Sequence, residues 1–180
     1  QIFLRALLVL NAHTWPFVNA TRACIALPLW ISNIAAKAVA FKEALEPEFK
    51  EYAKQIKKNT KILEQEFVRL GYKLCFGGTD NHLLLADVYG SLGVTGQEAE
   101  RVLDEVGITL NKNMIADETR TAMDPSGIRF GTPAMTTRRM KEGEATQVAE
   151  MMVARLKDIK NEVKAKELKA AVEELCLRFP

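Results

Sequence analysis

The sequence predicts a fold of the α/β class, more narrowly a small α+β domain in which a mostly antiparallel sheet is covered by helices on one face. Three observations carry this prediction. Apolar residues recur with helical spacing near both ends of the chain, short strand-like runs lie between them, and turn residues separate those runs. With 180 residues, 48% of them hydrophobic, the chain can bury one well-formed core.

Two consecutive helices are expected before the sheet. Residues 34–45 carry a helical apolar stripe, Pro47 punctuates the chain, and residues 49–70 resume the helical spacing until Gly71. The segments "YKLCF" and "HLLLADV" are predicted strands, and the glycines of the intervening "GGTDN" permit a tight turn. The pair is therefore expected to form a hairpin.

The clearest helix is expected in "VTGQEAERVLDEVG", where Thr95 and Glu98 have the spacing of a capping box and Gly107 ends the pattern. The next elements are a strand in "ITLNKN", a long polar loop and a strand in "GIRF". From Lys141 onward a helical stripe is expected, and a last helix follows it. The apolar positions of these two helices are Val148, Met151, Met152, Leu156 and Ile159, then Val172, Leu175 and Leu177.

Composition narrows the function. A net charge of only +2 speaks against a nucleic-acid partner. The apolar run "CIALPLWISNIAA" is too short, and too broken by Pro28, Ser32 and Asn33, to cross a bilayer. Cys24, Cys75 and Cys176 lie far apart in the sequence without the spacing of a disulfide framework or a zinc site, so the expected location is the cytoplasm. Only two histidines are present, His13 and His82, and no metal site is expected.

The start of the chain differs from the rest. No Asp or Glu occurs from Gln1 to Lys42, and the text up to Ser32 follows neither a helical nor a strand period. We therefore expect a boundary between an atypical apolar leader, residues 1–32, and a domain of residues 33–180. Such a leader is what a shifted reading frame or a chimeric gene would give.

The stretch "SGIRFGTPAM" contains the main candidate binding residue, Arg129. Its guanidinium presents a planar set of donors that suits two parallel hydrogen bonds to a carboxylate or phosphate. The strand looks buried, so a fixed anionic partner is expected. That partner is either a local carboxylate, Asp117 or Asp124, or a small-molecule carboxylate.

The long polar loop in "NKNMIADETRTAMDPSGIRFGTP" is the second candidate, because long loops on a rigid sheet often carry function. Asn111, Lys112 and Asn113 either surround a polar ligand or form an Asx-type turn that satisfies its own backbone. His82 begins an apolar strand, which favours a hydrogen-bonded structural role over a catalytic one.

Several motifs, taken in order, resemble the C-terminal part of serine hydroxymethyltransferase over residues 33–180. They are "EALEPEFKEYAKQIKKNTKILEQEFVRLGYKL", "GGTDNHLLLADV", "VTGQEAE", "GITLNKNMI", "SGIRFGTPAMTTR" and "CLRFP". The resemblance implies the C-terminal small domain of a fold-type I pyridoxal-phosphate enzyme. That family transfers a one-carbon unit from serine to tetrahydrofolate, giving glycine, and works as a homodimer or higher oligomer.

The resemblance also implies site residues. Arg129 matches the family's arginine that binds the carboxylate of serine or glycine. This role agrees with the planar set of donors that a guanidinium presents. Asn113 matches the folate-contacting asparagine of "NKN". Thr121, Ala122 and Met123 lie where the family's loop also touches folate, although "TRTAMDP" differs from the family's usual form.

Other departures concern the cofactor, pyridoxal 5'-phosphate. The family's Schiff-base lysine lies in a Thr-rich segment followed by His-Lys, and no lysine of this sequence has that context. The family's glycine-rich stretch, which binds the cofactor phosphate, is replaced in this sequence by "RACIALPLW". Two further differences from the family lie outside the cofactor site: Ala116 stands where the family has a proline, and Arg139 stands where it has a glycine. We therefore expect no catalytic residue, only substrate and folate contacts, in a chain that is inactive alone. The alternative is a non-catalytic domain that associates with an intact subunit.

Overall fold

The computed structural model describes the backbone of residues 22–180 and the side chains from residue 31 onward. Most of the expected leader, and with it His13, lies outside the described residues, and the boundary at residue 32 stays a prediction. The chain divides into two compact units between Glu51 and Tyr52. The elements of residues 22–180 are α2 (Arg22–Leu45), α3 (Pro47–Arg69), β1 (Lys73–Leu74), the 3-10 turn η2 (Cys75–Gly77), β2 (Leu83–Asp87), α4 (Val88–Leu92), α5 (Gly96–Glu105), β3 (Asn111–Asn113), β4 (Gly127–Gly131), α6 (Pro133–Thr137), α7 (Glu142–Lys157) and α8 (Glu162–Arg178).

Helix α2 makes up most of the described first unit. The sequence predicted a helix only from residue 34, whereas α2 already begins at Arg22. It passes Pro28, which removes one backbone N–H donor from the helical ladder. The segment broken up by Pro28, Ser32 and Asn33 in the sequence is therefore continuous helix. No helix of residues 22–180 is long and apolar enough to cross a membrane.

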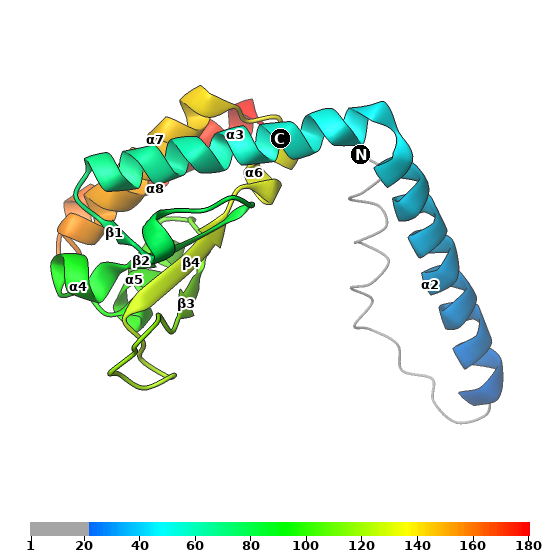
Figure 1. Ribbon diagram of the computed structural model, residues 1–180, viewed down its shortest axis with the longest axis horizontal. Helices are drawn as coiled ribbons and strands as arrows, with labels where there is room; N and C mark the ends of the chain where they lie inside the picture. Colours follow the sequence, from blue (N-terminus) through cyan, green and yellow to red (C-terminus); the bar gives the residue numbers. More distant parts are fainter. Residues whose placement is uncertain (1–21) are drawn as a thin grey trace. The chain divides into compact units, whose positions relative to one another are not determined.

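The sheet of the second unit is antiparallel throughout, with strand order β1-β2-β4-β3 (Figure 1). The expected hairpin of β1 and β2 is confirmed. Strand β4 pairs with β2 on one side and with β3 on the other, so the two strands next to each other in sequence, β2 and β3, are separated by β4. This insertion makes β4 a central strand and leaves β3 at the edge.

One face of the sheet is buried under helices, as predicted. Leu84 and Ala86 of β2 and Ile128 and Phe130 of β4 are all buried on this face, and α5 contacts both β3 and β4. The opposite face carries the alternate residues of the same strands and is partly open among the described residues: Leu83 and Arg129 are exposed there, whereas Leu85 is half-buried and Gly127 is buried. We call this the open face.

Local signals account for the best-defined helix. Thr95 Oγ1 accepts a hydrogen bond from Glu98 N at 3.2 Å, and Glu98 Oε2 accepts one from Thr95 N at 3.1 Å. This is the reciprocal capping box that the sequence predicted for α5. The short helices α4 and α6 were not predicted, since five residues are too few to show a helical period.

Helix α6 is fixed to α3 by a buried polar network. Thr132, fully buried just after β4, donates from Oγ1 to Ile56 O at 2.9 Å and lies 2.7 Å from Thr60 Oγ1. Asn59, also fully buried, donates from Nδ2 to Thr136 Oγ1 at 2.9 Å and to Met140 O at 3.0 Å. Buried polar groups with satisfied bonds fix a unique arrangement, so this network holds Thr132 and α6 against α3.

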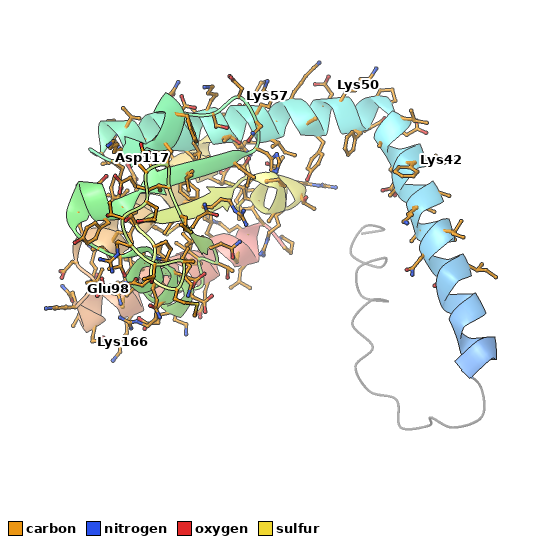
Figure 2. The ribbon with its side chains drawn as sticks, turned by 60° about the horizontal axis from the view of Figure 1, so that its bottom comes forward. Lys42, Lys50, Lys57, Glu98, Asp117 and Lys166 are labelled. Carbon is orange, nitrogen blue, oxygen red and sulfur yellow. The ribbon has the colours of Figure 1, made fainter. Side chains whose placement is uncertain are left out.

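Charged side chains lie on the solvated faces of the helices. Lys57, Glu98 and Lys166 are exposed and lie at the surface in Figure 2. Met152 is buried in the core and Met151 is half-buried. Cys75 and Cys176 are free thiols, and the side chain of Cys24 lies outside those described.

Candidate functional site on the open face of the sheet

Arg129 lies in the middle of β4 and on the open face. Its neighbours along the strand, Ile128 and Phe130, are buried in the core, so alternation places Arg129 on the opposite side, where it is exposed. Across the sheet it pairs with Leu85 of β2 and with Asn111 of β3. The guanidinium therefore has an apolar neighbour on one strand and an amide on the other.

The expectation that Arg129 is buried is wrong, and of the two alternative partners the local carboxylates, Asp117 and Asp124, do not pair with it. A central strand of an antiparallel sheet can be buried on one face only, and Arg129 is on the uncovered one. Asp124 is paired with Arg120, and Asp117 is exposed in a left-handed conformation with φ 58°. Within residues 31–180 no carboxylate pairs with Arg129, whose donors are thus available to a ligand.

Two glycines shape the surface around Arg129. A Cβ added to Gly127 would lie 2.5 Å from Ile115 Cγ2, and one added to Gly131 would lie 2.9 Å from Leu83 Cδ2 and 2.5 Å from His82 O. Ile115 and Leu83 thus occupy the space that side chains at these positions would fill. Arg129 has an apolar residue on either side along β4, and such surroundings strengthen its attraction for an anion.

Asn113 lies on the same face as Arg129, opposite Gly127 in the register. Its Nδ2 donates to Met114 O at 2.6 Å, a bond to the backbone of the next residue, whereas in an Asx turn the side-chain oxygen accepts from the backbone N–H two residues on. The side-chain oxygen keeps its capacity to accept a hydrogen bond from a ligand. Lys112 points to the opposite side, where its Nζ lies 3.6 Å from Glu100 Oε2.

The loop after Asn113 is held by a single carboxylate. Glu118 accepts hydrogen bonds from Ser126 Oγ at 2.7 Å, Ser126 N at 2.9 Å, Arg120 N at 2.9 Å and Ile115 N at 3.4 Å. Desolvation opposes ionisation, but these four donors outweigh it and lower the pKa of Glu118 to about 2. Glu118 therefore joins both ends of the loop, including Ile115 beside Arg129.

Thr121, Ala122 and Met123 lie exposed in a turn of this loop. The turn is closed by a bridge between Thr121 and Asp124, with Asp124 N donating to Thr121 O at 3.1 Å. Arg120 stabilises it by pairing with Asp124 and by lying 4.6 Å from the ring centre of Tyr89. Of the predicted site residues, the structure brings Arg129 and Asn113 onto one face and leaves these three on the turn.

His82 differs from its expected structural role. Its side chain is exposed and makes no hydrogen bond with the described side chains and backbone. Only its backbone takes part in the fold, since His82 O accepts from Thr132 N at 3.3 Å. The position before a strand, which suggested a satisfied side chain, fixes the backbone alone.

The fold and this face define an α+β domain whose open sheet face carries a cation free of protein partners within residues 31–180. A protein-family model described as serine hydroxymethyltransferase matches residues 28–152, well over half of the chain, and the chain belongs to that family. Membership implies glycine hydroxymethyltransferase chemistry, which is pyridoxal-phosphate-dependent one-carbon transfer with serine and folate as substrates.

The described residues do not fit the covalent attachment of that cofactor. A Schiff-base lysine is activated by burial in an apolar pocket or by a neighbouring cation. None of the lysines in residues 31–180 is buried; all are exposed except Lys112, which is paired with Glu100.

Three features of the site were missed from sequence: the apolar surroundings of Arg129, the clamp formed by Glu118, and the role of the two glycines. The glycines gave a signal, because "GIRFG" places one at each position two residues from Arg129, on the same strand face. The other two features depend on residues between 11 and 46 positions away from Arg129, namely Glu118, Ile115 and Leu83, for which no local pattern exists.

Proposed function

We propose that this chain supplies the part of a serine hydroxymethyltransferase that binds the substrate carboxylate and folate. The observation that carries the proposal is the free guanidinium of Arg129 on the open face, beside Leu85 and between Leu83 and Ile115. A cation in this position grips a carboxylate through two parallel hydrogen bonds. The amino acid is then held by its carboxylate in a fixed orientation.

Folate contacts are assigned to Asn113 and to the turn of Thr121, Ala122 and Met123. Asn113 supports this assignment because it shares the face of Arg129 and keeps an acceptor for a polar ring. Met123, 74% exposed, offers an apolar surface to a ring system. A folate lying from β3 towards the turn would contact both groups.

The test is a titration of the chain with glycine, followed by NMR of the arginine and backbone amide signals. We expect saturable shifts around Arg129 in the millimolar range, as befits about 4 kcal/mol of binding from one charged clamp. Glycinamide, which lacks the carboxylate, should produce none of them. Arg129→Gln should abolish the response, while Arg139→Gln, which removes an exposed arginine at the end of α6, should keep it. Equal binding by Arg129→Gln would refute the assignment.

We further propose that the present 180 residues do not turn over alone, since the described lysines lack the burial that a Schiff-base lysine needs. Treatment with pyridoxal phosphate and borohydride, followed by peptide mapping, should give scattered, substoichiometric labelling. A single lysine labelled stoichiometrically would overturn this statement.

The alternative, a non-catalytic domain that associates with an intact subunit, is favoured by one observation. The uncovered sheet face and the neighbouring turns expose large apolar side chains, among them Phe76 at 87%, Met114 at 47% and Leu83 at 37%. Co-purification with an intact serine hydroxymethyltransferase tests it. A strictly monomeric chain that does not associate would argue against it.

A further inference from the structure

We infer that Asn111 acts with Arg129 in holding the substrate carboxylate, as a second hydrogen-bond donor from the neighbouring strand. The inference rests on the proposed function of Arg129. It adds a residue of β3 to a grip that the arginine alone would otherwise provide.

The register is the first support. Asn111 and Arg129 are directly opposed in the antiparallel pair of β3 and β4, which sets their Cβ atoms about 4.5–5.5 Å apart. Both side chains are exposed on the open face. An asparagine amide and an arginine so placed can reach the same ligand atom.

The asymmetry of the surroundings is the second support. On the β2 side the cross-strand neighbour is Leu85, which offers no hydrogen bond, whereas on the β3 side it is Asn111. A guanidinium and the carboxylate bound to it therefore find no additional hydrogen-bond partner on the β2 side of β4 and find one on the β3 side. There the amide Nδ2 of Asn111 donates to the carboxylate and its Oδ1 accepts from the arginine.

The state of the two asparagines is the third support. Asn113 has already used a donor on Met114 O, at 2.6 Å. Asn111 makes no side-chain hydrogen bond within residues 31–180, so both ends of its amide are available. The two asparagines of "NKN" thus divide their tasks: Asn111 serves the carboxylate and Asn113 serves folate.

The experiment is the glycine titration with substitutions on β3, using glycinamide as the ligand without a carboxylate. Asn111→Ala should weaken glycine binding about three- to tenfold, as expected for one hydrogen bond to a charged group. Asn111→Asp should weaken it more than tenfold, because its charge repels the carboxylate and pairs with Arg129. Lys112→Ala, on the same strand but the opposite face, should leave affinity within twofold. The side-chain NH₂ signals of Asn111 should shift on titration.

The outcomes separate the two proposals. If Arg129→Gln loses glycine while both Asn111 variants bind as the unaltered chain does, the inference about Asn111 is wrong and the proposed function stands. If the unaltered chain shows no carboxylate-dependent binding, the proposed function fails and the inference with it. Thermal unfolding of each variant shows that the strand is intact, so that reduced binding reflects the lost amide.

Discussion

Replacing Gly96 by alanine is the sharpest test of how α5 is seated on the sheet. Gly96 is the first residue of α5, and its N donates to Pro125 O at 2.7 Å. A Cβ at this position would lie 2.4 Å from Gly127 O and 2.9 Å from Pro125 O. Both are backbone atoms leading into β4, so neither can turn aside as a flexible side chain could.

The magnitude follows from two opposing effects. Alanine gains up to about 1 kcal/mol over glycine in a helix. Overpacking against an immobile neighbour typically costs about 1–3 kcal/mol, and an overlap with backbone lies at the upper end. Gly143→Ala is the matched control, since Gly143 also lies in the first turn of a helix, α7, and nothing lies within 4 Å of its added Cβ. The propensity gain is common to both variants, so they should differ by the overpacking cost, about 2–3 kcal/mol in the free energy of unfolding.

Urea unfolding followed by circular dichroism measures this difference directly. For a chain of this size it corresponds to a gap on the order of 10 °C in Tm, with Gly143→Ala the more stable variant. Equal stability of the two variants would refute the close approach of α5 to the start of β4.

The remaining predictions concern single side chains of the second unit. Tyr72→Phe should leave the free energy of unfolding in urea unchanged or raise it by about 1 kcal/mol, because the buried Tyr72 hydroxyl has no hydrogen-bond partner in the described chain. Burial also raises the pKa of this hydroxyl. A loss of more than about 1 kcal/mol would mean that the hydroxyl is paired. Arg139→Gly should raise Tm by a few degrees, since Arg139 is exposed with φ 67°, where glycine alone is unstrained; a lower Tm would show that the arginine side chain contributes more than the strain costs. Glu118→Gln should lower stability by about 1–3 kcal/mol at pH 7. The pKa of Glu118 is lowered from 4.5 to about 2, so the contribution of its carboxylate to stability is complete above pH 4.5 and is lost as the pH falls towards 2. The stabilities of the unaltered chain and of Glu118→Gln should therefore converge over that pH range. A difference in stability that does not change with pH would contradict the role of the Glu118 carboxylate in holding the loop.

Local patterns in the sequence were sufficient for several elements. The capping box of Thr95 and Glu98 involves residues three apart, and the hairpin of β1 and β2 depends on the turn between them. Both are decided by neighbours in sequence. For the same reason the helices α7 and α8 follow from their periodicity.

At the site, residue types alone led to a hypothesis that stays a prediction: an arginine in a strand followed by Gly131, Thr132 and Pro133 indicated a grip on an anion. The family that the motifs resemble is the family to which the chain belongs. The burial of that arginine was wrong, because a single strand does not show which of its faces is covered.

What the sequence by itself determined was the position of the helices α3, α5, α7 and α8, with the capping box of α5, and the hairpin of β1 and β2. Only the tertiary structure decided that β4 lies between β2 and β3, that Asn111 stands opposite Arg129, and that Asn59 joins α3 to α6. The physical reason is range. Capping and periodicity act over a few residues, whereas strand order and buried polar networks join segments tens of residues apart through packing that only the folded chain provides.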